Sequence, residues 1–169
     1  MSDEITAWFI GRLPSNWFTG PAQIRADREE ILISGPVEEP VLEGEPDETA
    51  TSAARTARIK RFREETRDTR MGIADEAEHL FGRKVSWGAS CGDTTYVFTN
   101  VAVPVMTRLR LGERQVLDTL IDAGVARSRS EALAWCVRLV EKNQAEWITQ
   151  LRDALVSVSK LRDEGPSVA

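Results

Sequence analysis

Side chains that could carry out catalysis are few in this 169-residue sequence. The single histidine, His79, has no second imidazole with which to share a metal ion or a proton transfer. Cys91 and Cys136 fall in different expected elements without paired spacing, so neither a disulfide nor a zinc site is predicted, and both thiols are expected to be reduced. Carboxylate-only chemistry stays open, but the sequence has neither a phosphate-binding glycine loop nor a nucleophile elbow. We therefore predict a protein that is not an enzyme, with no catalytic residue, metal site or cofactor.

Arginines gather in two patterns, the first of which follows a helical period. Its members are Arg55, Arg58, Arg63, Arg67 and Arg70, with Lys60 and Arg61 between them. Guanidinium groups on one helix could bind nucleic-acid phosphates or an acidic partner. However, Glu64, Glu65 and Asp68 are interleaved with them, and opposite charges at helical spacing usually pair on a solvated surface. We favour the paired surface and keep a nucleic-acid or partner face as the alternative.

The second pattern lies on residues 105–111, where side-chain types alternate as on an extended strand. The alternation separates a basic face from an apolar face: Met106, Arg108 and Arg110 against Thr107, Leu109 and Leu111. We predict a short strand here.

Helices are predicted after this strand. The first runs from Glu113 to Ala123, and Gly124 supplies the left-handed residue that ends it. The second is expected to begin with Ser130 as its N-cap and Glu131 in its first turn. A further helix, with apolar residues at helical spacing, is expected over residues 145–161.

The preceding hundred residues are predicted to combine hairpins with one long helix. Alternating residues 5–10 and a second strand over residues 23–33 predict a first hairpin. The next predicted element is a helix over residues 52–81, ended by Gly82, and a second hairpin follows between residues 83 and 100. The expected fold class is α+β. Its segments are a β-hairpin region (1–36), an acidic linker (37–52), a helix plus hairpin (53–102), a strand-helix-helix element (103–143) and a C-terminal helix (144–163).

Charge is distributed unevenly along the chain. The net charge is -5, but residues 1–50 carry -8, whereas residues 51–102 carry +2 and residues 103–169 carry +1. This argues against indiscriminate nucleic-acid binding and leaves a basic face available outside the N-terminal segment. The longest apolar run near the N-terminus, residues 7–10, is too short for a signal peptide or a membrane span, so we expect a cytoplasmic protein with no membrane partner.

The C-terminal part resembles the ribbon-helix-helix proteins of bacterial and phage repressors and antitoxins. The resemblance covers about forty residues, between positions 105 and 142. It depends on the alternating strand, Leu117-Asp118-Thr119-Leu120, Gly124 and the stretch from Arg127 through Ser128-Arg129-Ser130-Glu131 to Leu133. The middle of the chain, from Arg55 to Trp87, resembles uncharacterised actinobacterial proteins, which imply no function.

The ribbon-helix-helix resemblance implies a homodimer that binds DNA and regulates transcription. In that family two chains pair their strands antiparallel, because a lone strand has two unpaired edges, and the ribbon enters the major groove. Met106, Arg108 and Arg110 would contact bases, since arginine can bind guanine through two hydrogen bonds. Arg127, Arg129 and Ser130 would contact a phosphate at the start of the second helix.

Two departures from the family keep a second interpretation open. About a hundred residues precede the strand, whereas the family's ribbon is usually N-terminal, and Pro104 stands at its start. A further helix follows the element. The alternative is a dimeric adaptor, or a factor that binds RNA or a ribonucleoprotein through Arg55 to Arg70, in which the ribbon-helix-helix element serves only dimerisation.

Overall fold

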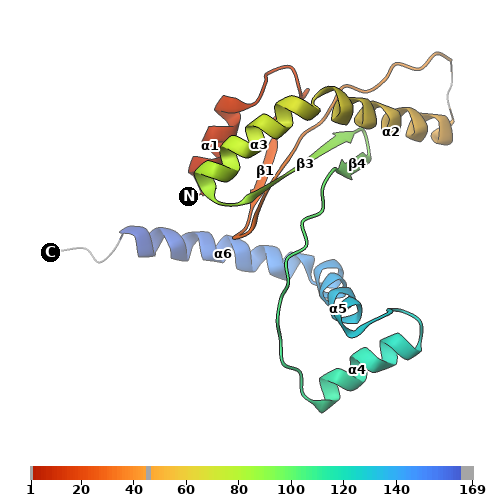
Figure 1. The fold of residues 1–169 in the computed structure, drawn as a ribbon, viewed down its shortest axis with the longest axis vertical. Helices are drawn as coiled ribbons and strands as arrows, with labels where there is room; N and C mark the ends of the chain where they lie inside the picture. The colour runs from red at the N-terminus through yellow and green to blue at the C-terminus, as the bar shows by residue number, and fades with distance from the viewer. Residues whose placement is uncertain (1, 45–46, 165–169) are drawn as a thin grey trace. The chain divides into compact units, whose positions relative to one another are not determined.

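The chain divides into two compact units, residues 1–104 and residues 105–169 (Figure 1). The computed structural model describes residues 2–44 and 47–164. In the first unit the elements are α1 (Ser2–Arg12), β1 (Gln23–Ala26), β2 (Glu30–Ser34), α2 (Glu48–Glu65), α3 (Arg67–Phe81), β3 (Lys84–Cys91) and β4 (Thr94–Val97). In the second they are α4 (Leu111–Asp122), α5 (Arg129–Asn143) and α6 (Ala145–Glu164).

The predicted α+β fold class is confirmed by these helices and strands. None of the helices described here has the length and apolar composition that a membrane crossing requires.

The first element is a helix, so the strand predicted over residues 5–10 was wrong. Ile5 and Phe9 are fully buried, whereas Ala7 between them is exposed, which is the pattern of a helix face and not of a strand. Asp3 and Glu4 in the first turn and Arg12 in the last suit the helix dipole. The two buried residues fit a period of two as well as a period of 3.6.

Four strands form one sheet in the order β1-β2-β3-β4. The stretch predicted as one strand over residues 23–33 is instead the hairpin β1–β2, which ends one residue later at Ser34. The carboxylate of Asp27 accepts backbone hydrogen bonds from Glu29 and Glu30 at its turn. The second predicted hairpin is confirmed as β3–β4, with Gly92 in the left-handed region (φ 54°) at its turn. The hairpins join through parallel pairing of β2 with β3, in which Ile33 lies opposite Trp87.

Two helices, α2 and α3, connect the two parallel strands. The prediction of a single helix over residues 52–81 was therefore wrong. The first helix ends and the second begins at Thr66, whose hydroxyl donates to the Phe62 carbonyl (2.6 Å) and accepts from Arg70 Nε (2.9 Å). A threonine hydroxyl bonded to the carbonyl four residues back commonly bends a helix. Gly82, with φ 65°, ends α3 as predicted.

The predicted acidic linker is shorter than residues 37–52. At one end Val37 is buried, and its N–H donates to the Ser90 carbonyl (2.7 Å), so this residue extends the contact with β3. At the other end Asp47 caps α2 by accepting from the Ala50 N–H (2.7 Å). Residues 45–46 of this predicted segment lie outside the described residues.

The core of the first unit lies between the sheet and its helices. Figure 1 shows α1 and α3 beside the strands, and their buried residues Phe9 and Ile73 pack with Ile33 and Trp87. A second cluster places Phe62 of α2 against residues of β3. This arrangement fixes the backbone of α2 and α3, and therefore the positions of their arginines.

Candidate nucleic-acid interface

The second unit is built around a small apolar core. Among the described residues of this unit, its buried core consists of Leu117, Ala126 and Ala132. Leu109, which precedes α4, packs against them together with half-buried residues of α4 and α5. The contact anchors the chain just before α4, and so it fixes the end of the segment that carries Arg108 and Arg110.

Residues 105–110 lie outside helix and strand in the single chain. The backbone of Arg110 is extended (φ -79°, ψ 171°), and Leu111, predicted as the end of the strand, is instead the first residue of α4. A β-strand is defined by hydrogen bonds to a neighbouring strand, and the single chain offers none here. The strand predicted over residues 105–111 is therefore not formed in the single chain, and Leu111 belongs to α4.

Exposure along this segment follows the predicted alternation only in part. Met106 is fully exposed (101% relative exposure), and Arg108 and Arg110 are exposed, as a base-contacting face requires. On the other face Leu109 packs inward, but Thr107 and Leu111 are exposed. Two of the three residues on the predicted apolar face, Thr107 and Leu111, are thus exposed to solvent in the single chain.

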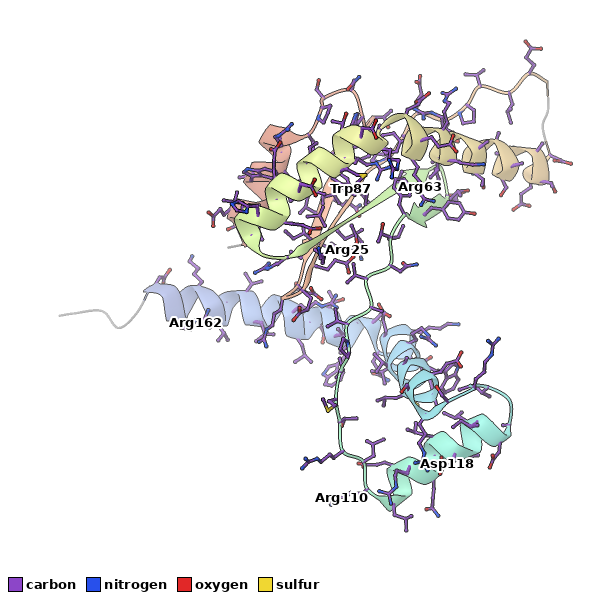
Figure 2. The ribbon with its side chains drawn as sticks, in the orientation of Figure 1. Arg25, Arg63, Trp87, Arg110, Asp118 and Arg162 are labelled. Atoms are coloured by element: carbon purple, nitrogen blue, oxygen red, sulfur yellow. The ribbon has the colours of Figure 1, made fainter. Side chains whose placement is uncertain are left out.

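The backbone around Arg110 is held by two side chains of α4. Glu113 accepts a hydrogen bond from the Arg110 N–H, and Arg114 Nη1 donates to the Leu109 carbonyl (2.6 Å). Figure 2 shows Arg110 where the connecting chain enters α4. Both contacts use backbone atoms, so the guanidinium of Arg110 stays exposed while its backbone is fixed.

Helix α5 begins two residues earlier than predicted. Ser128, not Ser130, is its N-cap, and its hydroxyl accepts from the Glu131 N–H (3.2 Å). The carboxylate of Glu131 in turn accepts from the Arg127 N–H (2.8 Å). Arg129 and Ser130 are consequently the first two helical residues, whose N–H groups have no intrahelical acceptor.

The guanidinium of Arg129 is paired with the carboxylate of Asp118. Nε and Nη2 lie 2.7 and 2.8 Å from the two carboxylate oxygens. Hydrogen bonding from Arg129 lowers the pKa of Asp118, and the same contact raises the pKa of Arg129. The structure thus places Arg129 in an ion pair, while Arg127 and Ser130 are exposed.

A hollow of about 310 Å³ lies between residues 105–109 and the start of α5. Its lining includes the apolar side chains of Val105, Leu109 and Leu133, with Arg129 and Ser130 beside them. Of the residues predicted to contact DNA, Met106, Arg129 and Ser130 line this hollow, whereas Arg108, Arg110 and Arg127 are not part of its lining.

The contact of Asp118 with Arg129 was not predicted from the sequence, because these residues become neighbours only after α4 and α5 pack. The contact of Arg114 with the Leu109 carbonyl is local, and it was not predicted either.

The five arginines predicted as a face on α2 and α3 do not act as one group. Arg70 is buried: its Nη2 donates to the Arg63 carbonyl (2.6 Å), and its guanidinium lies over the Phe98 ring at 5.0 Å. Burial, followed by repulsion from Arg63 and Arg67, lowers the pKa of Arg70 to about 10.

The remaining arginines differ in their partners. Arg55 bonds Glu39 (3.0 Å) and lies 3.5 Å from Asp93, whereas Nη1 of Arg58 is buried without a hydrogen-bond partner. Arg67 contacts only its chain neighbour Asp68, at 3.6 Å, among the ion pairs of the described chain. Figure 2 shows Arg63 where α2 approaches α3. Much of the predicted arginine face therefore consists of guanidinium groups that are paired with carboxylates or buried.

Comparison with known proteins matches both units. The family model described as Rv1265-like protein, N-terminal domain, matches residues 3–97, and the model described as Mb1296 C-terminal domain matches residues 110–162. The chain belongs to the Rv1265-like family. Members of the family include the uncharacterized protein Mb1296 of Mycobacterium bovis and the uncharacterized protein Rv1265 of Mycobacterium tuberculosis. Each is 54% identical over 161 residues, which are 95% of this chain and 70% of the relative. No solved structure matches the chain.

Membership of the Rv1265-like family leaves the activity open. The names of these relatives state no function, and neither family is described as containing a ribbon-helix-helix element. The boundary between the matched ranges lies close to residue 104, where the two compact units divide. The function must therefore be argued from the two units themselves.

Proposed function

We propose that the protein is a homodimeric, sequence-specific DNA-binding regulator of transcription whose second unit is a ribbon-helix-helix element. The observation that carries the proposal is the exposure of Arg108 and Arg110 on a segment anchored by Leu109. Residues 105–110 form no helix or strand in the single chain, so no strand of the same chain pairs with this segment. A second copy of the segment supplies the partner strand in antiparallel pairing.

The paired segments would form a two-stranded ribbon that fits the major groove of B-form DNA. Met106, Arg108 and Arg110 project from it toward the bases, and each arginine can bind the O6 and N7 atoms of guanine. Fixing the Arg110 backbone through Glu113 supports this role, since a rigid backbone reduces the conformational entropy lost on binding.

The start of α5 supplies the phosphate contact. The N–H groups of Arg129 and Ser130 lie in the first turn, where the helix dipole favours an anion. The exposed Arg127 adds a positive charge beside them. Arg129 contributes mainly through its backbone, because its side chain is engaged by Asp118.

Binding to fragmented genomic DNA tests this proposal. The wild type is compared with Arg108→Ala/Arg110→Ala and with Arg138→Ala/Lys142→Ala, a control that removes the same charge from exposed positions of α5. We expect the wild type and the control to recover a discrete DNA site and the first variant to lose it. Loss of one bidentate contact between arginine and guanine reduces the binding preference for the correct base over a wrong base by about 1–3 kcal/mol.

Two results would overturn the proposal. One is a wild-type protein that binds no discrete site at low salt, which would leave the ribbon-helix-helix element with dimerisation alone. The other is equal loss of affinity in both double variants, which would indicate nonspecific attraction to phosphate. The slope of log K against log salt concentration distinguishes sequence-specific binding from nonspecific attraction, because each phosphate contact makes this slope more negative by about 0.9.

A further inference from the structure

Helix α2 and the edge strand β4 enclose a hollow of about 240 Å³ within the first unit. The two elements are in contact, and Figure 1 shows β4 beside α2. The α2 side of the hollow is one helix face, because its residues lie three, four and seven positions after the first: Thr56, Ile59, Lys60 and Arg63. Tyr96 and Phe98 line the opposite side. We call this hollow the α2–β4 pocket.

The α2–β4 pocket has apolar and aromatic walls. Ile59 is 2% exposed, and Phe98 packs on Phe62 at 6.3 Å between ring centroids. Tyr96 lies opposite the buried Ala89 of β3, and cross-strand partners project from the same face of a sheet. The Tyr96 ring therefore stands on the side that α2 covers, yet it is 48% exposed. Its exposed part is an aromatic wall without a packing partner that covers it.

Two cations border these apolar walls. Lys60 and Arg63 are exposed, and within the described residues neither takes part in an ion pair, whereas Arg61 between them lies 3.6 Å from Glu65. The described lining contains no carboxylate. The guanidinium of Arg63 lies 5.7 Å from the centroid of the Phe98 ring, so positive charge and an aromatic wall are adjacent. Such a pocket suits a ligand with an apolar body and one anionic group.

Positive charge is in excess at this end of α2. Burial, followed by repulsion from Arg63 and Arg67, lowers the pKa of Arg70, whose guanidinium lies over the same Phe98 ring. An anion beside Arg63 would offset this repulsion. Lys60 and Arg63 lie in the last two turns of α2, away from the N–H groups at its start, which are the groups that favour phosphate. Two side-chain cations without such N–H donors suit the single charge of a carboxylate.

We propose that the α2–β4 pocket binds a small aromatic carboxylate, with its ring against Tyr96 and Ile59 and its carboxylate on Lys60 and Arg63. Arginine holds a carboxylate through two parallel hydrogen bonds, and aromatic rings gain from edge or offset contacts with each other. The volume is below the ~300–1,000 Å³ of pockets for drug-sized ligands, so a ligand with one ring or a fused pair of rings fills it. The inference concerns the first unit and does not depend on DNA binding.

Heteronuclear NMR of the isotopically labelled full chain tests the inference by titration with benzoate, 3-phenylpropionate and indole-3-acetate. The amide signals of Lys60, Tyr96 and Phe98 report both the Kd and the place of binding. We expect at least one of the acids to bind with a Kd of about 1 mM or below, which is within reach of a ligand of roughly ten non-hydrogen atoms. The uncharged 3-phenylpropanol should bind at least about tenfold more weakly than 3-phenylpropionate.

Variants separate the charge of the pocket from its shape. Lys60→Gln/Arg63→Gln removes both cations, and Arg61→Gln/Arg67→Gln removes the same charge from exposed positions outside the lining. We expect the first variant to raise the Kd at least about tenfold and the control to leave it nearly unchanged. Thr56→Phe places a ring in the pocket and should abolish binding while both cations remain. Urea unfolding checks that each variant is folded.

Four results would overturn the inference. They are a Kd above about 1 mM for all three acids, binding of the alcohol as tight as that of its acid, equal affinity in the two double variants, and undiminished binding in Thr56→Phe. A wild type that binds an acid in the α2–β4 pocket but recovers no discrete DNA site would overturn the proposed function and leave this inference standing.

Discussion

Arg129 of α5 and Asp118 of α4 form a bidentate ion pair, in which Nε lies 2.7 Å from one carboxylate oxygen and Nη2 lies 2.8 Å from the other. Figure 2 shows Asp118 on α4. The pair joins the start of α5 to the helix that precedes it. It also neutralises a cation at the proposed phosphate site, so Asp118 limits what Arg129 can contribute to DNA binding.

Asp118→Asn should strengthen DNA binding. The substitution removes a negative charge from the interface and releases Arg129 to contact a phosphate. The slope of log K against log salt is then expected to become steeper by about 0.9, the contribution of one additional phosphate. Fluorescence anisotropy with the recovered DNA site at several salt concentrations measures the slope.

Asp122→Asn provides the matched control, because Asp122 is an exposed acid of the same helix. It removes the same charge without releasing Arg129. A slope that changes equally in both variants would show a general charge effect. An unchanged slope in Asp118→Asn would mean that Arg129 does not reach a phosphate.

The ion pair should also make stability depend on pH in the acidic range. Hydrogen bonding from Arg129 lowers the pKa of Asp118 in the folded state below its unfolded value of about 3.9. A carboxyl group with a lowered folded pKa stabilises the protein above the unfolded pKa, and this stability is lost as the pH falls through the folded pKa. The wild type should therefore exceed Asp118→Asn in urea midpoint at pH 7, with the difference shrinking below about pH 4. A difference that stays constant down to pH 2 would contradict this.

Arg70 should be a stabilising residue of the first unit and not a ligand contact. Its guanidinium donates to Thr66 Oγ1 (2.9 Å) and to the Arg63 carbonyl (2.6 Å), and it packs on Phe98. Arg70→Ala is expected to lower the free energy of unfolding by about 2–4 kcal/mol, since buried acceptors lose a charged donor. Urea unfolding followed by tryptophan fluorescence reports the change, because Trp87 is buried in this unit.

Arg67→Ala is the comparison for Arg70, because the Arg67 side chain is mostly exposed. Its substitution should change the free energy of unfolding by less than about 0.5 kcal/mol. Similar losses in the two variants would mean that the buried contacts of Arg70 add nothing to stability.

Local signals in the sequence were sufficient for several elements of the fold. Gly82 and Gly124 end helices in the left-handed region, as glycine permits, and these two ends were predicted correctly. The hairpin with its turn at Gly92 follows from two short strands separated by turn residues. Each of these features is decided within a few residues.

Features that depend on distant residues were not predictable in the same way. Ile5 and Phe9 fit both a strand and a helix, and only their packing on the sheet decides between them. The parallel pairing of β2 with β3 joins residues more than fifty positions apart.

The candidate site was predictable in its residue types and less so in its contacts. The alternation correctly indicated that Arg108 and Arg110 are exposed and that Leu109 packs inward, but it also placed Thr107 and Leu111 on the inward face, and both are exposed. Pairing of Arg129 with Asp118 requires α4 and α5 to be packed, so it could not be inferred from spacing. Ribbon pairing needs a second chain and stays a prediction.

Gly35→Ala and Gly72→Ala should change stability in opposite directions. A Cβ at Gly35 would lie 2.5 Å from the Phe18 ring, which cannot withdraw freely because it packs on Phe62 at 5.5 Å between ring centroids. We expect a loss of about 1–3 kcal/mol in the free energy of unfolding from this overpacking. A Cβ at Gly72 in α3 meets nothing within 4 Å, and alanine is favoured over glycine in a helix by about 1 kcal/mol. Urea unfolding of both variants measures the difference, and a stabilising Gly35→Ala would show that Phe18 can repack.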